Sequence, residues 1–210
     1  VEIHIVSSID GLKKVKLPSG YKNYVQGNLK KEKTIKINHV GERAIVCLID
    51  DSANLEKSRE LGAKLAQYCA GEKIKKSHLS GSANADQVLA VAEGMALANY
   101  QFLKYYADAK KRKNSLNSVE ITHNDISKDD INELNNVVNA VYEVRDLVNE
   151  PQSYLTAIQL SEEIKRMGAE AGFKVEVLNQ KKIESLKMGG LLAVNRGSVQ
   201  PATFSIMEWK

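Results

Sequence analysis

The residues best suited to metal binding or proton transfer are four histidines, and they are far apart in the sequence. His4, His39, His78 and His123 form neither an HExxH segment nor a cluster with cysteine, so no zinc-binding motif is present. A site assembled from distant residues remains open. Because isolated histidines more often lie on the surface or cap helices, we favour that structural role.

An acidic pair, Asp50-Asp51, directly follows the apolar run Ala44–Ile49. Such a run, ended by acids, is typical of a strand buried on both faces. Ligands and catalytic groups often lie at the carboxyl ends of parallel strands, which would make the pair a candidate site. Acids at that position also form turns and cap helices, and we favour this second interpretation.

Motifs for phosphate binding and for nucleophilic catalysis are missing. The sequence contains no GxGxxG, no Walker motif and no GxSxG, and its one Gly-Gly pair, Gly189-Gly190, precedes an apolar segment. The two cysteines, Cys47 and Cys69, form no CxxC pair, and we expect small buried hydrophobic residues in a reducing compartment. Neither nucleotide binding nor covalent catalysis is predicted.

The charge is mildly basic, with 30 Lys+Arg against 26 Asp+Glu and a net charge of +4. Lysines gather at 13–16, 30–36, 73–76 and 110–113, but aromatic residues are not interleaved with them, so a solvated surface is favoured over DNA binding. No run of about 18 apolar residues is present, so no membrane span is expected. The alternating segment Val1–Val6 is not typical of a signal peptide, and a cytoplasmic location is expected.

Strand and helix patterns alternate along the chain, which predicts an α/β fold with a mainly parallel sheet in each part. The predicted strands cover 1–7, 33–38, 44–49, 73–79, the surroundings of Val119 and Ile121, 174–178, 191–194 and 203–209. The predicted helices cover 55–69, 88–105, the segment from Ser127 to Pro151, the segment after Thr156, and 180–187. Segments 10–32 and 110–114 are predicted to be loops.

The helix that begins after Ser127 is the natural domain boundary. Ser127 is a good N-cap, and Asp129 and Asp130 lie in the first turn. Pro151 ends the helix, because the residue before a proline is disfavoured in the helical region. Its apolar stripe consists of Ile131, Leu134, Val138, Val141 and Val148. We therefore predict a first domain over 1–126, a linking helix over 127–151, and a second domain that begins at 152 and continues to 210.

Two C-terminal stretches resemble the leucyl aminopeptidases of peptidase family M17. Arg145–Pro151, followed by Leu155-Thr156, resembles the family's R-D-L-x-N-x-P and L-T-P segments, with Ala157 in place of the proline. Met188–Ser198 resembles M-G-x-L-L-A-V-x-x-G-S. A weaker likeness to E-G-x-x-L-x-x-Y-x-F-x-x-Y comprises Glu93, Gly94, Leu97, Tyr100, Phe102 and Tyr105, and Phe173–Leu178, Pro201 and Trp209-Lys210 also fit.

The resemblance implies an α/β N-terminal domain similar to macro domains, and a catalytic domain that removes N-terminal residues from peptides with two bridged cations, Zn or Mn. The family's ligands are a Lys, three Asp and a Glu, in the motifs G-K-G-x-x-F-D-S-G-G and N-T-D-A-E-G-R. Neither motif occurs in this sequence. No catalytic, cofactor-binding or metal-binding residue is therefore assigned, and this chain alone is predicted to be inactive.

The resemblance also implies partners. Full-length relatives form hexamers, so we expect a homo-oligomer, with the chain's own catalytic domain and peptide substrates as further partners. The alternative function is a binding or assembly module, for an ADP-ribose-type ligand, for DNA, or as a hexamer scaffold. The polar loop Asn195–Ser198 is the segment held open for contact with the catalytic part or with a neighbouring subunit.

Overall fold

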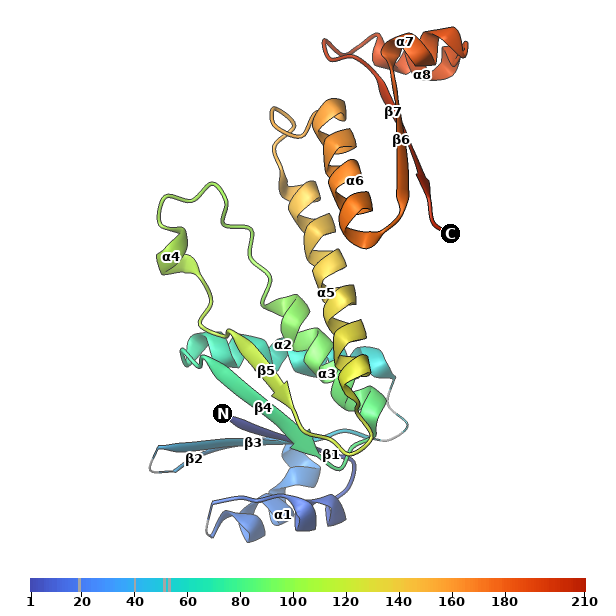
Figure 1. Cartoon of the computed structure of the whole chain (residues 1–210). Helices are drawn as coiled ribbons and strands as arrows, with labels where there is room; N and C mark the ends of the chain where they lie inside the picture. Colours follow the sequence, from blue (N-terminus) through green and yellow to red (C-terminus); the bar gives the residue numbers. More distant parts are fainter. Residues whose placement is uncertain (19, 40, 51, 53) are drawn as a thin grey trace. The chain divides into compact units, whose positions relative to one another are not determined.

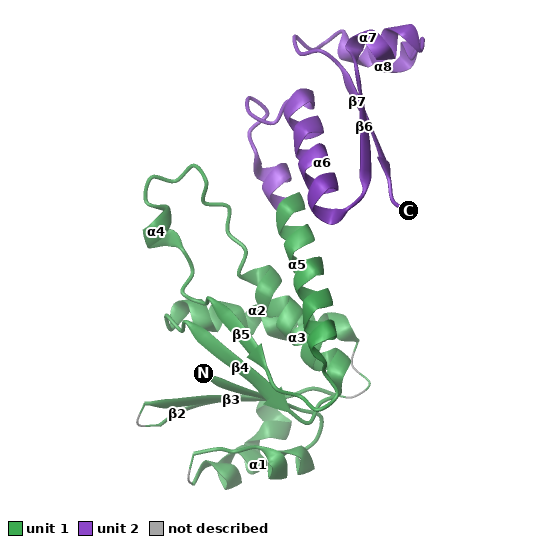
Figure 2. Ribbon diagram, viewed as in Figure 1, with its two compact units in different colours: residues 1–144 green, residues 145–210 purple. Residues whose placement is uncertain are grey.

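The computed structural model describes residues 1–18, 20–39, 41–50, 52 and 54–210. The chain divides into two compact units, residues 1–144 and residues 145–210, which are coloured separately in Figure 2 and are described separately below. The division falls within a long helix, α5 (Lys128–Asn149).

The first unit is built on a five-stranded sheet with the strand order β2-β3-β1-β4-β5 (Figure 1). The strands are β1 (Glu2–Val6), β2 (Thr34–His39), β3 (Glu42–Leu48), β4 (Lys76–Gly81) and β5 (Ser118–Ile121). Four of them are parallel, and β2 pairs with β3 in the antiparallel sense. The predictions of an α/β fold and of a mainly parallel sheet are confirmed for this unit.

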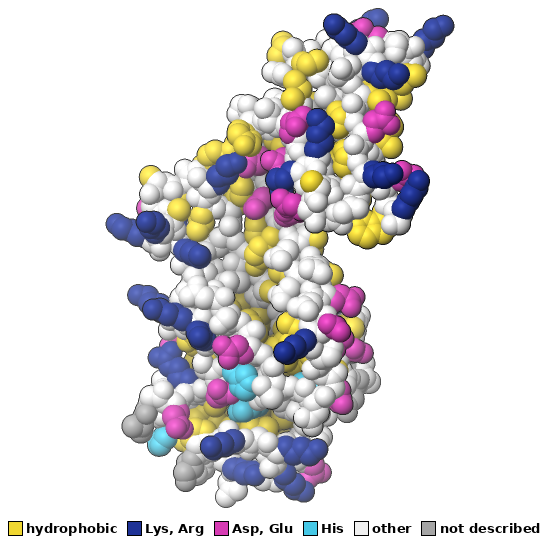
Figure 3. Space-filling model, viewed as in Figure 1, with side chains coloured by type: hydrophobic (Ala, Val, Ile, Leu, Met, Phe, Trp, Pro, Cys, Tyr) yellow, Lys and Arg dark blue, Asp and Glu magenta, His cyan; other side chains and the backbone are white. Residues whose placement is uncertain are grey.

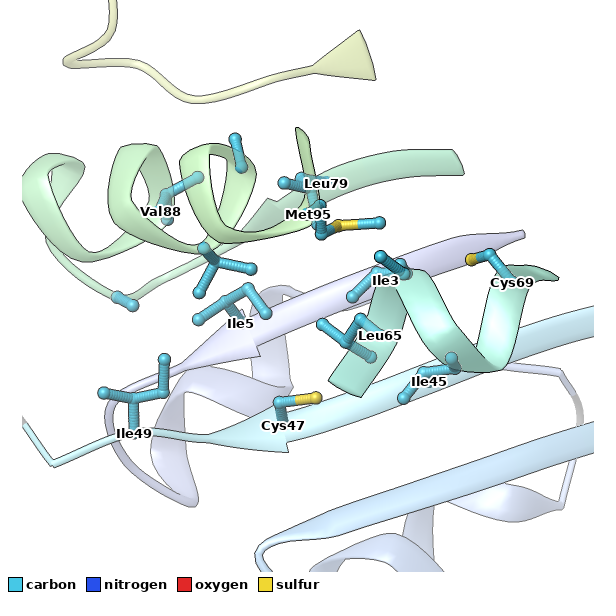
Figure 4. Packing of buried hydrophobic residues seen from close by; sticks show 14 of the residues in the cluster. Ile3, Ile5, Ile45, Cys47, Ile49, Leu65, Cys69, Leu79, Val88 and Met95 are labelled. Carbon is cyan, nitrogen blue, oxygen red and sulfur yellow. The ribbon is translucent and has the colours of Figure 1, made fainter. Parts of the chain in front are cut away.

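The two faces of the sheet are covered by different helices. Ile3 and Ile5 of β1 lie on the face that packs against α2 (Leu55–Gly71) and α3 (Ala85–Ala98), as Figure 4 shows. Val6 lies on the opposite face, with side chains from the short 3-10 helix η1 (Asp10–Lys14) and from α1 (Tyr21–Glu32). This division follows from the period of two along a strand.

Helices α2 and α3 cross at two glycines. A Cβ atom on Gly62 would lie 2.1 Å from the Val91 carbonyl oxygen, and one on Gly94 would lie 2.1 Å from the Arg59 carbonyl oxygen. Beside this contact, Arg59 Nε donates to Glu93 Oε2 at 2.8 Å. The segment Glu93-Gly94, which is part of the weaker family likeness, therefore lies where α3 packs against α2.

Three predictions for the first unit were wrong. The predicted loop 10–32 contains η1 and α1, because Val25 and Leu29 anchor an otherwise polar helix in the core. The predicted helix 88–105 ends at Ala98, where the Asn99 side chain donates to the Leu116 backbone carbonyl. Phe102 and Tyr105 keep the helical spacing in the sequence, but they lie beyond the end of the helix. The predicted loop 110–114 also contains a short helix, α4 (Ala109–Arg112).

Helix α5 begins as the sequence predicts. Ser127 Oγ accepts a hydrogen bond from the Asp130 backbone N–H at 3.2 Å, and Asp130 Oδ2 accepts one from the Ser127 backbone N–H at 2.8 Å. This reciprocal pair is a capping box, which satisfies donors that the first turn would leave unpaired. Val138 is buried, but Val148 is 78% exposed, so its assignment to a buried stripe was wrong.

The second unit contains α6 (Ala157–Ala171), an antiparallel ribbon of β6 (Lys174–Asn179) and β7 (Thr203–Glu208), and two short helices, α7 (Gln180–Ser185) and α8 (Gly189–Asn195). The parallel sheet predicted here was wrong for the strands described. The strand predicted over 191–194 is part of α8, because Leu191 and Leu192 pack against Ile183 and Leu178. A four-residue apolar run has no period that separates a strand from a helix.

Gly94→Ala should destabilise the first unit, because the new methyl group would overlap the Arg59 carbonyl oxygen. We expect a loss of about 2–3 kcal/mol in the free energy of unfolding, as in overpacked cores, measured by urea denaturation. The matched control is Gly27→Ala in α1, where a Cβ meets no atom within 4 Å. That change should be neutral or stabilising, by up to about 1 kcal/mol. Equal stability of both variants would contradict the close crossing of α2 and α3.

Val138→Asp should place a charge on the buried side of α5, where Val138 is 8% exposed. The cost should be roughly several kcal/mol, reduced if the carboxyl group takes up a proton. Val137→Asp is the control, because the neighbouring Val137 is 46% exposed. Thermal unfolding should show a large drop in melting temperature only for Val138→Asp, and similar melting temperatures would show that the buried face of α5 is misassigned.

Candidate functional site

A polar cavity of about 720 Å³ lies in the first unit beside strands β1, β4 and β5. Its walls come from side chains along these strands, from Glu2 and His78 onward, and from the segments that follow them, Ser7, 82–84 and 122–125. Lys14, the last residue of η1, and the two residues after it complete the wall. Only a few of the lining side chains, such as Val15 and Ala83, are apolar.

Three of the four histidines line this cavity. His4 Nδ1 lies 2.9 Å from Ser80 Oγ. His78 lies between Glu2 and Thr122: its Nδ1 is 2.6 Å from Glu2 Oε2, and its Nε2 is 2.8 Å from Thr122 Oγ1. In the parallel register Glu2 lies opposite His78, and His4 lies opposite Ser80. Strand pairing therefore brings together residues that the sequence separates by 76 positions.

The third histidine of the cavity is His123, and the fourth histidine, His39, lies elsewhere. His123 also lines the cavity, and its Nε2 lies 2.9 Å from the Ala83 backbone carbonyl oxygen. His39, at the end of β2, packs edge-on against the Tyr21 ring at 5.5 Å between centroids. The structural role favoured from the sequence fits His39, and the other three histidines, far apart in the sequence, line one cavity.

Burial shifts the proton equilibrium of His4. The side chain is 5% exposed, and desolvation lowers its pKa below 6.5, with the nearby Glu2 carboxylate partly opposing this effect. The neutral ring is therefore favoured in the folded protein. A backbone hydrogen bond with Lys16 acts in the same direction as Glu2 and raises the pKa of His4.

The wall of the cavity depends on a turn at Gly81. The Ile5 carbonyl oxygen accepts hydrogen bonds from the backbone N–H groups of Ser82 at 2.9 Å and Ala83 at 3.1 Å. Gly81 has φ = +140°, and a Cβ there would lie 1.9 Å from the same oxygen. This position requires glycine, because other residues would meet the β1 backbone.

The cavity residues do not fit a metal centre. Among the residues that the structure describes, no group of three or more His, Cys, Asp or Glu side chains is arranged to hold a metal ion. The histidine nitrogens that line the cavity instead contact Ser80, Glu2, Thr122 and the Ala83 carbonyl oxygen.

Asp50, the first residue of the acidic pair, accepts two hydrogen bonds after β3. Asp50 Oδ1 accepts hydrogen bonds from the Ser52 backbone N–H at 3.0 Å and from Ser52 Oγ at 2.8 Å, and these bonds lower the pKa of Asp50. The Asp50 carbonyl oxygen also accepts a bond of 2.7 Å from Gln87 Nε2. The structural interpretation is confirmed for Asp50, and Asp51 lies outside the described residues.

The cysteines are buried and unpaired, as the sequence predicts. Burial raises the pKa of Cys47 to about 12 and raises that of Cys69 as well, so both thiols are protonated at neutral pH. Neither is a candidate nucleophile. Lys and Arg side chains lie at several separate places on the face shown in Figure 3, and acidic side chains lie between them.

Comparison with solved structures defines the class of fold. A mutant of tomato leucine aminopeptidase superposes with a TM-score of 0.77 at 18% identity, over 98% of this chain and 46% of that one. The bottromycin maturation enzyme BotP, in complex with Mn, superposes with a TM-score of 0.72 at 20% identity, over 100% of this chain and 45% of that one. At this identity the likeness shows the fold, which is that of leucine aminopeptidases.

Sequence comparison finds relatives in one peptidase family. Residues 142–210 match the model of the cytosol aminopeptidase family, catalytic domain. A probable cytosol aminopeptidase of Chloroherpeton thalassium is 61% identical over 67 residues, which are 32% of this chain and 13% of that protein. One of Sulfurihydrogenibium sp. is 34% identical over 132 residues, which are 60% of this chain and 26% of that protein. Residues 142–210 therefore resemble the catalytic domain of the cytosol aminopeptidase family, M17, and the matched parts span about a quarter of these relatives or less.

The sequence did not reveal the cavity. His4 and His78 lie within strands whose alternation was visible, and the alternation could have placed each of them on the polar side of its strand. The order of the strands was not visible, and it decides which residues are neighbours. In the described part of the chain, no helix is both long enough and apolar enough to cross a lipid bilayer.

The folded protein should lose stability on mild acidification because of His4. Its pKa is below 6.5 in the folded state, so the stability it contributes is present above about pH 6.5 and is lost as the pH falls through the folded value. Urea denaturation at pH 8 and at pH 5.5 should show a smaller loss for His4→Gln than for the unmodified protein. His39→Gln, which lies outside the cavity, should behave like the unmodified protein. An identical pH dependence in all three would exclude His4 as the cause.

Proposed function

We propose that this chain is the non-catalytic N-terminal portion of an aminopeptidase that removes N-terminal residues from peptides. The observation that carries the proposal is the match of residues 142–210 to the catalytic domain of the cytosol aminopeptidase family. The motifs Arg145–Pro151 and Met188–Ser198 lie within this match. The names of the relatives, cytosol aminopeptidases, favour a cytoplasmic reaction.

The proposed reaction uses two divalent cations, Zn or Mn. A structural neighbour, BotP, is described in complex with Mn, which is consistent with a divalent metal in this family. The residues of this chain do not fit such a centre: the Lys/Asp and Asp/Glu motifs do not occur in the sequence, and residues 151–210 contain no aspartate. We therefore assign the metal ligands to sequence outside this chain, and no catalytic step to its side chains.

The proposed domain organisation has a macro-like domain over 1–126, a linking helix over 127–151, and the beginning of the peptidase domain over 152–210. The ribbon of the second unit suits this last role. β7 has β6 on one side and, in the described part of the chain, no strand on the other. An unpaired edge is open to a further strand. The chain's own catalytic domain is the proposed partner.

A second candidate function is assembly, and exposed apolar side chains favour it. In the second unit Phe204, Ile206 and Met207 of β7 are 37%, 42% and 58% exposed, and the adjacent Trp209 is 74% exposed. Apolar side chains gathered in this way are typical of surfaces that become covered in an assembly. The covering partner would be the catalytic domain or another subunit of a homo-hexamer, and the Asn195–Ser198 loop is open for the same contact.

The purified 210-residue chain should not hydrolyse leucine p-nitroanilide in the presence of added Mn or Zn. A two-metal site needs several ligands held on rigid elements, and this chain does not supply them. The reading frame that encodes the chain should continue into the two ligand motifs, and the longer product should be active and inhibited by chelators. Host peptidases are controlled for with a mock purification from cells that lack the gene.

Two results would contradict the proposal. The first is chelator-sensitive turnover that copurifies with the 210-residue chain, which would place the metal site within it. The second is a natural stop codon directly after Lys210, which would leave the protein without the ligand motifs. A longer product that is inactive towards several aminoacyl p-nitroanilides would argue for the assembly function instead.

A further inference from the structure

The cavity beside β1, β4 and β5 lies at a topological switch point of the sheet. The chain that leaves β1 passes through η1 and α1 to β2 and β3, on one side of β1. The chain that leaves β4 passes through α3 to β5, on the other side. In open α/β sheets, ligands bind outside the carboxyl ends of the strands where the connections diverge in this way.

Charges of both signs line the cavity. Asp125 lies in the segment after β5, and Lys14 and Lys16 lie in the segment after β1. None of the three makes an ion pair with another described residue, whereas the neighbouring Lys13 is paired with Asp10 at 2.9 Å. A carboxylate and two ammonium groups are therefore available to a ligand in the same cavity.

Uncharged polar groups complete the lining. Two imidazole–hydroxyl pairs, His4 with Ser80 and His78 with Thr122, lie on adjacent strands. Ser82 Oγ is buried and makes no hydrogen bond of normal geometry. Buried polar atoms of this kind are normally satisfied, so this hydroxyl favours a ligand or water that can donate and accept hydrogen bonds.

We propose that this cavity binds a free amino acid with a polar side chain. Lys14 or Lys16 would pair with the carboxylate, and Asp125 would pair with the ammonium group. The side chain would lie against the imidazole–hydroxyl pairs. A purely anionic ligand, such as a sugar phosphate, fits less well because Glu2 and Asp125 would repel it, and an apolar ligand would leave the polar lining unpaired.

A free amino acid is also what an aminopeptidase releases. The cavity would then sense the product, and this physiological role rests on the proposed function. The ligand class itself rests on the cavity alone. Binding is measured on the 210-residue chain without any hydrolysis, so failure of the binding proposal and failure of the peptidase proposal give different results.

The first test compares L-glutamine with analogues that lack one charge. Titration calorimetry should detect L-glutamine, and N-acetyl-L-glutamine and L-glutaminamide should each bind about tenfold more weakly, because each loses one charge-assisted hydrogen bond. Ribose 5-phosphate should bind more weakly than L-glutamine. Equal binding of the three glutamine compounds, tighter binding of ribose 5-phosphate, or no binding of L-glutamine would each overturn the proposal.

The second test locates the site. Asp125→Asn should weaken L-glutamine binding about tenfold but leave N-acetyl-L-glutamine unaffected, because that analogue has no ammonium group. The double variant Lys14→Gln/Lys16→Gln should weaken L-glutamine and N-acetyl-L-glutamine, and leave L-glutaminamide unaffected. Lys13→Gln and Asp129→Asn, which change charges outside the cavity, are the matched controls. These are surface changes, and circular dichroism verifies folding. Equal effects of cavity and control variants would place the site elsewhere.

Discussion

The first unit depends on the burial of strand β1 in the middle of its sheet. Ile3 and Ile5 are fully buried on the face covered by α2 and α3, and Val6 is fully buried on the face covered by α1. A strand that serves two cores cannot shift by one residue without exchanging both sets of side chains. The same register that buries these residues places His4 and Glu2 opposite Ser80 and His78, so the cavity is a consequence of core packing.

Close backbone contacts support this arrangement at two positions. The Ile5 carbonyl oxygen holds the turn after β4 through the N–H groups of Ser82 and Ala83, and Gly81 makes the approach possible. On the other side of the same core, Gly62 and Gly94 let α2 and α3 cross within contact of their backbones. Each glycine stands where a methyl group has no room: Gly81 against β1, and Gly62 and Gly94 between α2 and α3.

The second unit has a smaller sheet and a smaller hydrophobic core than the first. Its described strands form a two-stranded ribbon, and its small core consists of Leu178, Ile183 and Ala202 with a few partly buried neighbours. A ribbon of two strands is marginal in water unless it packs against further structure. Several apolar side chains of β7 are also exposed, and the chain covers less than half of its solved structural neighbours.

The sequence by itself determined the α/β class, the resemblance to the M17 family and the elements with strong local signals. Ser127 and Asp130 predicted the start of α5, and the motifs Arg145–Pro151 and Met188–Ser198 predicted the family, because caps and motifs are local patterns. Only the tertiary structure decided the rest. α1 depends on two buried side chains, α8 on contacts with Ile183, and the cavity on the order of the strands. These depend on long-range contacts, which no local pattern of residues encodes.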